Sequence, residues 1–281
     1  MRCKSVLLRV DALRTGELPE RERQNMHEHF ATCDSCSASL HDVRALASRM
    51  KSMLAPKSTS IGDAYDRIDD VWVAYTKEGL RLIQRGGTFD DFRSAYAARY
   101  GRPLQQAPIP DALRKQVVAA MQGEGVDKPR VDWSGKRPLE REVLALLSKI
   151  PRGEVRTYEW IARHVGRPRA VRAVGTILAK NSVPLVVPCH RVVPTAGGVG
   201  NYAFGSAMKR DLLQREGVDV DALEKLAKQH VRYIGSRTTK IACMPTCKDA
   251  KRIREENRVA FHDAREAGEA GFRGCMRCEP F

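Results

Sequence analysis

The spacing of hydrophobic and polar positions predicts a small helical module at the start of the chain. Residues 4–14, 19–31 and 36–53 have helical spacing, and the second segment opens with Pro19 followed by acidic residues, as is typical of a helix N-terminus. The segment APKSTS, residues 55–60, has the composition of a linker. The module is therefore expected to be separate from the rest of the chain.

After the linker, the pattern indicates a mixed subdomain. VWVAYT and GLRLIQRG flank Lys77-Glu78-Gly79 and have the spacing of a β-hairpin. Helices are predicted near residues 89–100 and 109–121. This region contains no obvious chemistry.

From Pro138 the pattern becomes helical, and Val155 to Lys180 predicts two short helices joined by a tight turn. Thr157 can cap a helix formed by YEWIARHV, and Gly166-Arg167-Pro168 makes the turn. In the second helix, RAVRAVGTILAK, three residues are expected to face inward, Val171, Val174 and Leu178. This is the pattern of a helix-turn-helix, and residues 219–230 predict a further helix leading to the end of the chain.

Charge narrows the class of partner. The chain has 49 Lys and Arg against 34 Asp and Glu, a net charge of +15. Between Lys128 and Arg191 there are 14 basic and 5 acidic residues, so this segment alone carries 14 − 5 = +9. Such a concentration favours a nucleic acid as partner. No stretch reaches the roughly 20 apolar residues of a membrane span, and the start lacks a signal peptide, so a cytoplasmic, nucleoid-associated protein without membrane contact is expected.

The eight cysteines fall into three sets. In a reducing cytoplasm, closely spaced cysteines indicate metal ligands or redox centres before disulfides. Seven have such spacing: Cys3, Cys33 and Cys36 near the start, and Cys243, Cys247, Cys275 and Cys278 near the end. Cys189 stands alone, and a lone cysteine is either an inert buried thiol or a nucleophile. A nucleophilic thiol needs a base to form its thiolate, and His190 follows directly.

The segment around Cys189 resembles a known family. NSVPLVVPCHRVVPTAGGVGNYAFGSAMKRDLLQREG is similar to the active-site region of the O6-alkylguanine-DNA alkyltransferases, also called methylated-DNA–protein-cysteine methyltransferases. The resemblance rests on PCHRVV, on the GNY that follows, and on Asn181, Lys209 and Glu216 at family spacing. It extends weakly back to about residue 62 and so covers over half of the chain.

The resemblance implies a single-turnover repair enzyme that needs no organic cofactor. Cys189 would take the alkyl group from O6-alkylguanine, and from O4-alkylthymine, irreversibly onto its sulfur. It implies a relay from Cys189 through a water to His190 and Glu216. Tyr158 would donate a hydrogen bond to the departing base, and Asn181 would hold the active-site turn.

The implied partner is double-stranded DNA with the alkylated guanine flipped out, because the reacting oxygen lies inside the stacked duplex. The resemblance implies that Arg172 enters the stack in place of the base, and Arg169 and Lys209 are further expected DNA contacts. Tyr202 belongs to the loop that closes over the guanine. Phe204 is expected to line the pocket and restrict it, which predicts slow reaction with bulky O6-benzyl substrates.

The last four cysteines predict a closed tetrahedral zinc site, since Cys243-x3-Cys247 and Cys275-x2-Cys278 supply four thiolates in two close pairs. RTTKIACMPTC together with AGFRGCMRCEP resembles the zinc domain of Ada-type repair proteins. That implies a Cys243 that is both zinc ligand and acceptor of methyl groups from DNA phosphotriesters. Three family positions differ, namely Lys240, Ala242 and Met244, and the domain order is unusual, so a zinc-stabilised DNA clamp is the alternative.

The N-terminal set, Cys3-x25-His29-x3-Cys33-x2-Cys36, resembles the zinc-binding domain of anti-sigma factors. His29 lies one helical turn before Cys33, so both side chains can reach one ion; His27 is the alternative ligand. The resemblance implies a second zinc and a protein partner or a response to oxidation. The other interpretation is a helical pair with idle thiols.

The expected fold class is α+β and multidomain. The predicted domains are a helical zinc module at 1–54, an alkyltransferase N-terminal α/β subdomain at 61–130, a winged helix-turn-helix-like catalytic domain at 131–220, and a four-cysteine zinc domain at 231–281. The alternative to a repair enzyme is an alkylation-responsive, DNA-binding regulator or sensor.

Overall fold

A computed structural model describes residues 3–7, 9, 13, 18–41, 63–126 and 128–281. The chain divides into two compact units, residues 1–61 and 62–281. The linker predicted at 55–60 and the last part of the helix predicted over 36–53 lie outside the described residues. In the described part of the chain, no helix has the length and apolar character to cross a membrane.

The first unit is a small helical module. It contains α1 (Cys3–Leu7), α3 (Glu20–Thr32) and a helical segment over 34–41. The helix α3 begins after Pro19 with two acidic residues in its first turn, where they interact favourably with the helix dipole. Its described core consists of two fully buried side chains, Val6 and Met26, surrounded by Leu13, Leu18, Phe30 and Leu40.

The second unit begins with a four-stranded sheet of order β3-β2-β1-β4. The predicted hairpin is formed by β2 (Val71–Tyr75) and β3 (Leu80–Arg85). β1 (Asp63–Ile68) pairs antiparallel with β2, and β4 (Leu104–Gln106) pairs parallel with β1. Alternate side chains of β2 reach opposite faces, since Val71 and Val73 join a cluster with the helix α6, Asp111–Met121, whereas Ala74 packs with α5, Phe89–Tyr100. The two predicted helices thus cover the two faces of this sheet.

The middle of the second unit contains the predicted helix-turn-helix. Its helices are α8 (Tyr158–His164) and α9 (Val171–Ala179). The Thr157 hydroxyl accepts a hydrogen bond from the Trp160 backbone N–H, so the predicted cap is confirmed. Val174 and Leu178 are buried, and Val171 is partly buried.

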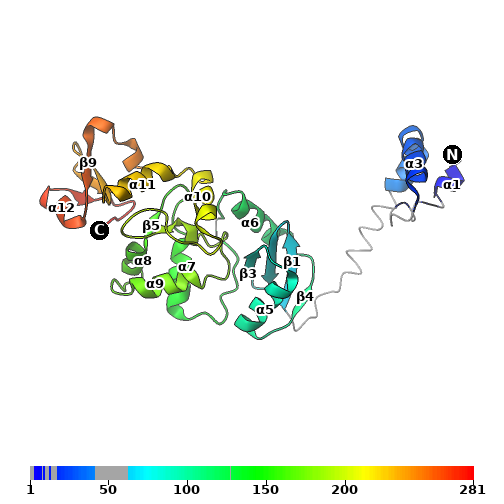
Figure 1. Cartoon of the computed structure of the whole chain (residues 1–281), viewed down its shortest axis with the longest axis horizontal. Coiled ribbons are helices and arrows are strands. Elements are labelled where there is room, and N and C mark those ends of the chain that lie inside the picture. The colour runs from blue at the N-terminus through cyan, green and yellow to red at the C-terminus, as the bar shows by residue number, and fades with distance from the viewer. Residues whose placement is uncertain (1–2, 8, 10–12, 14–17, 42–62, 127) are drawn as a thin grey trace. The chain divides into compact units, whose positions relative to one another are not determined.

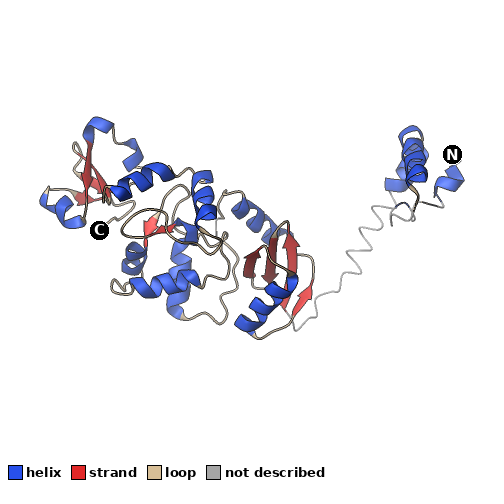
Figure 2. Cartoon of the chain, in the orientation of Figure 1, coloured by secondary structure: helices blue, strands red, loops and turns tan. Residues whose placement is uncertain are grey.

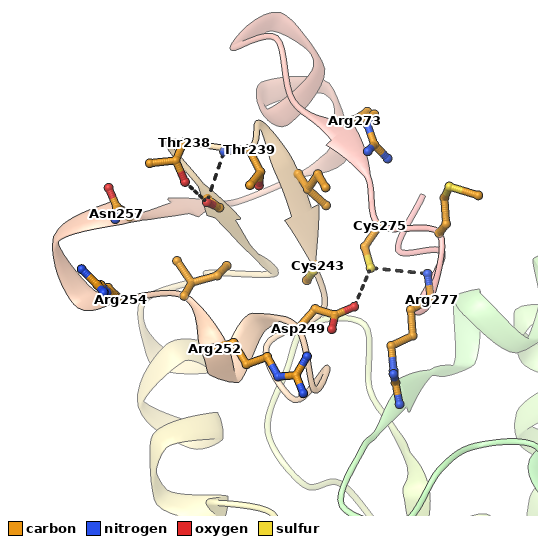
Figure 3. A pocket seen from close by; sticks show the side chains of 14 residues that line it. Thr238, Thr239, Cys243, Asp249, Arg252, Arg254, Asn257, Arg273, Cys275 and Arg277 are labelled. Atoms are coloured by element: carbon orange, nitrogen blue, oxygen red, sulfur yellow. Dashed lines mark hydrogen bonds between the residues drawn. The ribbon is translucent and has the colours of Figure 1, made fainter.

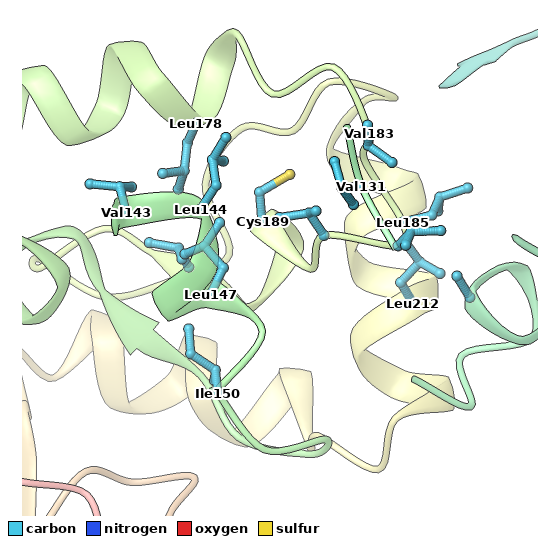
Figure 4. Packing of buried hydrophobic residues seen from close by; sticks show 14 of the residues in the cluster. Val131, Val143, Leu144, Leu147, Ile150, Leu178, Val183, Leu185, Cys189 and Leu212 are labelled. Carbon is cyan, nitrogen blue, oxygen red and sulfur yellow. The ribbon is translucent and has the colours of Figure 1, made fainter. Parts of the chain in front are cut away.

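Six short elements complete this middle part. α7 (Pro138–Leu147) packs beneath the helix-turn-helix, and a 3-10 turn, η1 (Cys189–Arg191), leads into β6. β5 (Arg156–Thr157) pairs in parallel with β6 (Val192–Val193). The chain continues through α10 (Ser206–Arg215) and α11 (Val220–Lys228). Figure 4 shows Cys189 beside the buried aliphatic side chains of this core, among them Leu144, Leu147 and Leu178.

The C-terminal part is a second four-stranded sheet of order β10-β8-β7-β9. Its strands are β7 (Tyr233–Ser236), β8 (Ile241–Cys243), β9 (Arg258–Phe261) and β10 (Arg273–Gly274). The helical elements are α12, Ala264–Glu269, and the 3-10 turns η2, Ala250–Arg252, and η3, Glu255–Asn257. A Cβ at Gly235 would lie 2.6 Å from the Phe272 ring, so only glycine fits beneath this aromatic side chain. Helices and strands are both well represented across the chain (Figure 2), and the mixed α/β, multidomain class is confirmed.

Candidate active site and metal centres

Cys189 lies on the buried 3-10 turn after Pro188, with a side chain held by Asn181. The Asn181 amide Nδ2 donates to Cys189 Sγ at 3.1 Å and to the Val187 carbonyl at 3.2 Å. Its Oδ1 accepts from the Val183 backbone N–H at 3.1 Å. One buried amide therefore holds both the backbone turn and the sulfur.

His190 and Glu216 form a buried pair. His190 Nε2 lies 2.9 Å from Glu216 Oε1. The same carboxylate accepts three further bonds from Arg191, from Nε to Oε2 at 2.9 Å and to Oε1 at 3.2 Å, and from Nη2 to Oε1 at 2.8 Å. Burial opposes ionisation of Glu216, but the hydrogen bonds from His190 and Arg191 outweigh it and lower its pKa to about 2. The sequence interpretation missed Arg191, although it stands inside the run PCHRVV.

The imidazole of His190 is suited to accept a proton. Burial lowers the pKa of His190, although Glu216 works against this effect, so the ring is neutral at neutral pH. With Nε2 facing a carboxylate, the proton belongs on Nε2 and the lone pair on Nδ1. Nδ1 is buried and has no hydrogen-bond partner among the described residues. The arrangement leaves one basic nitrogen available at the site.

Lys209 corrects a prediction. It was expected to contact DNA, but its side chain is completely buried. Its Nζ donates to the Val192 carbonyl at 2.6 Å and to the Asn201 carbonyl at 3.2 Å. Burial lowers the pKa of Lys209 to about 8, and the charge of Cys189 acts in the opposite direction. Lys209 therefore lies inside the site as a buried cation.

Burial and two neighbouring side chains, Asn181 and Lys209, shift the pKa of the Cys189 thiol. Burial raises the pKa of the thiol, whereas the Asn181 hydrogen bond and the positive charge of Lys209 lower it. The thiol is therefore protonated when the site is at rest, and formation of the thiolate requires a base. His190, next in sequence, is the buried base with a free nitrogen.

Three aromatic residues surround this centre. Tyr158 is the first residue of α8 and is half-buried; burial, and the negative charge that Cys189 carries as a thiolate, raise the pKa of Tyr158. The Tyr202 ring meets the His190 ring edge-on at a centroid distance of 6.0 Å, and Phe204 meets Tyr202 at 5.6 Å. The structure thus brings the predicted loop residues to the histidine.

The helix-turn-helix presents its basic residues to solvent. Arg172 lies in the first turn of α9, and Arg169 lies in the loop before it; both are exposed. Exposure is what a DNA contact requires. The roles of Arg169 and Arg172 in DNA binding remain predictions.

The last four cysteines form a compact buried cluster. The sulfur atoms of Cys243, Cys247, Cys275 and Cys278 all lie within 4.8 Å of one another. A tetrahedral zinc site with Zn–S bonds of about 2.3 Å places its sulfurs roughly 3.8 Å apart, so the set fits this ion. Backbone N–H groups of Met244 and Arg277 point at Cys278 and Cys275, each at 3.4 Å, and such bonds stabilise thiolates.

A cavity of about 620 Å³ opens beside this cluster (Figure 3). Cys243 and Cys275 line it, together with four arginines, Arg252, Arg254, Arg273 and Arg277. The sequence interpretation did not single out these arginines. They are spread over 26 residues of a generally basic chain (277 − 252 + 1 = 26), and only the fold gathers them.

The N-terminal set also comes together. Cys3, His29, Cys33 and Cys36 have donor atoms within 4.8 Å of one another, and the sulfurs of Cys3 and Cys33 are 3.9 Å apart. His29 Nε2 is buried and has no hydrogen-bond partner in the described residues, as a metal ligand would be before it binds. The structure selects His29 over His27 for this cluster.

Three family models match three parts of the chain. Residues 138–218 match the DNA-binding domain of 6-O-methylguanine DNA methyltransferase. Residues 225–280 match the metal-binding domain of Ada, and residues 3–37 match a family described as "putative zinc-finger". The chain carries an O6-methylguanine methyltransferase domain with a C-terminal Ada zinc-binding domain and an N-terminal module of that zinc-finger family. These family resemblances, predicted from the sequence, are confirmed.

Individual relatives agree with the central match. The chain is 49% identical over 78 residues to a human methylated-DNA–protein-cysteine methyltransferase, covering 27% of this chain and 38% of the human one. It is 44% identical over 84 residues to the protein of the same name from Shigella flexneri, covering 30% of this chain and 49% of that one. The chain thus spans less than half the length of these two relatives. A Mycobacterium tuberculosis OGT structure in complex with DNA matches at 26% identity with a TM-score of 0.45, covering 58% of this chain and 98% of that chain.

Proposed function

We propose that this protein repairs DNA by transferring the alkyl group of O6-alkylguanine, and of O4-alkylthymine, to Cys189 in a single turnover. One observation carries the proposal. A buried cysteine is held by the Asn181 amide at 3.1 Å and is followed by a histidine paired with a buried carboxylate at 2.9 Å. This arrangement supplies a nucleophile, a base and a group that orients the base.

The chemistry follows from these groups. The thiol proton of Cys189 passes, through a water, to Nδ1 of His190, and Glu216 stabilises the imidazolium that forms. The thiolate attacks the alkyl carbon, so that an S–C bond forms as the bond from that carbon to O6 breaks. The electron pair stays with guanine, and Tyr158 donates a hydrogen bond to the departing base. Lys209 stabilises the thiolate, and the thioether product is stable, so each molecule acts once.

Substrate access requires extrusion of the nucleotide, which costs a few kcal/mol. The exposed Arg169 of the helix-turn-helix would bind the duplex, and the exposed Arg172 would occupy the space that the flipped base leaves. Double-stranded DNA is thus the proposed partner of residues 131–220. The N-terminal module, residues 1–54, would bind a protein partner.

Each cysteine cluster would hold one structural zinc ion. Cys243, Cys247, Cys275 and Cys278 offer four thiolates, and the N-terminal set offers three thiolates and the imidazole of His29. Zinc takes both donor sets in tetrahedral geometry. The ion would tie together segments that are far apart in sequence and stabilise two small modules with limited cores.

Transfer of a labelled methyl group from O6-methylguanine duplex tests the proposal. Wild-type protein should become labelled at up to one methyl group per molecule, and the Cys189→Ser variant should not. Peptide mapping should place the label on the peptide that contains Cys189. Normal DNA binding without label on Cys189 would favour the alternative, an alkylation-responsive regulator.

A second acceptor at Cys243 is favoured by the arginine-lined cavity (Figure 3). Cys243 lines a space in which four guanidinium groups could hold DNA phosphates. We propose that methyl groups of DNA phosphotriesters transfer to Cys243. Reaction with an oligonucleotide that carries one labelled methyl phosphotriester tests this: label should survive in Cys189→Ser and map to the peptide that contains Cys243. Label on neither peptide would leave the domain as a zinc-stabilised clamp.

A further inference from the structure

The four-cysteine domain and the alkyltransferase domain share a buried polar contact. Glu154 is 3% exposed, and its Oε1 accepts from the Lys248 backbone N–H at 3.1 Å. The backbone N–H of Val155 donates to Thr246 Oγ1 at 2.9 Å. Thr246 and Lys248 flank Cys247, one of the four cysteines. The segment that leads into β5 is therefore hydrogen-bonded to the two residues on either side of Cys247.

A second contact reaches the turn that carries Glu216. Lys251 Nζ donates to the carbonyls of Gly153, at 3.3 Å, and Gly217, at 3.2 Å. Gly153 has a φ of +77°, and a Cβ there would lie 2.9 Å from the Glu216 carbonyl oxygen. The loop at 153 and the turn at 216–217 are thus packed together, and Lys251 bridges them.

A third contact holds the first helix of the helix-turn-helix. Trp160 Nε1 donates to the Cys278 carbonyl at 2.9 Å. Arg163 Nη2 donates to the Glu279 carbonyl at 2.7 Å, and His164 Nε2 lies 2.8 Å from Glu279 Oε2. Both ends of the cysteine cluster, near Cys247 and near Cys278, therefore touch α8 or the segment before it.

These contacts converge on the reacting groups. β5 ends at Thr157, directly before Tyr158, and pairs with β6, which follows the turn of Cys189 and His190. Lys251 bonds to the residue after Glu216. We propose that the four-cysteine domain positions the alkyltransferase site, with Thr246 and Lys251 as positioning residues for Tyr158 and Glu216. This proposal rests on the proposed transfer to Cys189, and it makes the rate of that transfer depend on the docked domain.

A matched pair of variants at Thr246 tests the proposal in the full chain. Thr246→Val keeps the shape but leaves the buried Val155 N–H without its acceptor, whereas Thr246→Ser keeps the hydroxyl. We expect Thr246→Val to lower the transfer rate at saturating O6-methylguanine duplex by roughly tenfold, with little change in the DNA concentration that gives half of that rate. Thr246→Ser should transfer methyl groups at the wild-type rate.

Two further variants distinguish a loss of positioning from a general destabilisation of the domain. Lys251→Met changes an exposed side chain and should lower the same rate by roughly threefold. Arg265→Met lies on α12 of the same domain, where Arg265 pairs only with Glu269 among the described acidic residues, and should leave the rate unchanged. The zinc content of every variant should match the wild type, and every variant should still unfold in one cooperative transition, at a somewhat lower temperature in Thr246→Val because a buried N–H loses its acceptor.

Hydrogen exchange separates this proposal from the proposed function. In Thr246→Val, and in protein stripped of metal by a chelator, amides of residues 154–164 and 214–218 should exchange faster, while those of β1 to β3 should not. Unchanged exchange in both segments, or an unchanged rate in Thr246→Val, would overturn the positioning role. If wild-type protein transferred no methyl group to Cys189, the proposed function would fail, and the exchange result would still decide whether the two domains are coupled.

Discussion

The Nε2 atom of His190 lies 2.9 Å from Oε1 of Glu216, and both side chains are almost completely buried. A buried ionised carboxylate is stable only with partners, and here it has the imidazole and also the Arg191 guanidinium. This pair fixes the tautomer of His190. It also makes the acid a source of stability for the fold around Cys189.

Glu216 thus acts on the stability of the fold and on the tautomer of His190, and the Glu216→Gln variant should show the effect on stability through its pH dependence. Because the pKa of Glu216 is lowered to about 2 in the folded protein, against 4.5 ordinarily, its ionisation stabilises the fold above pH 4.5. That stabilisation, about 3 kcal/mol, is lost as the pH falls from 4.5 towards 2. The free energy of unfolding measured in urea should therefore differ most between wild type and variant at neutral pH, and the difference should shrink below pH 4.5.

The same variant should transfer methyl groups roughly 10²-fold more slowly at neutral pH, because a neutral amide stabilises the imidazolium poorly. Glu159→Gln, an exposed position in the same domain, is the control and should behave as wild type. A pH-independent stability difference would contradict the ionised state assigned to Glu216.

Lys209 is buried and Arg169 is exposed, so substitutions at these two residues should affect DNA binding differently. Lys209→Met removes a buried cation near the sulfur and should slow transfer without weakening binding to duplex. Arg169→Ala removes an exposed charge and should lower the slope of log K against log salt by about 1. Binding titrations at several salt concentrations measure both, and a lower slope in Lys209→Met would show that the buried conformation is not the one that binds DNA.

The N-terminal cluster predicts a metal count. Wild-type protein should contain two zinc ions, and His29→Ala should retain one, because Nε2 of His29 lies in the cluster. His27→Ala is the matched control, since His27 is exposed on the same helix and outside the cluster. Elemental analysis after gel filtration gives the count; two zinc ions in His29→Ala and one in His27→Ala would show that His27, not His29, is the ligand.

Much of this site was predictable because its signals are local. The helix-turn-helix shows in the spacing of Val174 and Leu178, and the base is adjacent to the nucleophile. The hairpin of β2 and β3 was predicted, but β1 and β4 were not. β1 reads DAYDRI, with three charged residues in six, and β4 has only three residues, so neither has the alternation of a half-buried strand.

Other features depend on the fold as a whole. The resemblance implied that Lys209 contacts DNA, and because lysine is almost never fully buried, nothing in the sequence pointed to the interior. Only the tertiary structure places its amine beside two carbonyls. The contacts of Thr246 and Lys251 join segments that are about 35 to 100 residues apart. Nothing in either segment alone indicates its partner. The domain boundaries drawn at 54, 61, 131, 220 and 231 stay predictions.

Phe204 makes the last prediction, which concerns the size of the alkyl group. Its ring packs edge-on against Tyr202, 5.6 Å between centroids, and Tyr202 in turn contacts His190. A large side chain at this place should restrict the space beside the sulfur, so wild-type protein should react slowly with O6-benzylguanine compared with O6-methylguanine in DNA. Phe204→Ala should raise the O6-benzylguanine rate several-fold and change the methyl rate little, whereas Phe204→Leu, which keeps most of the volume, should resemble wild type. Equal wild-type rates for both alkyl groups, measured by competition for Cys189, would remove Phe204 as the residue that limits substrate size.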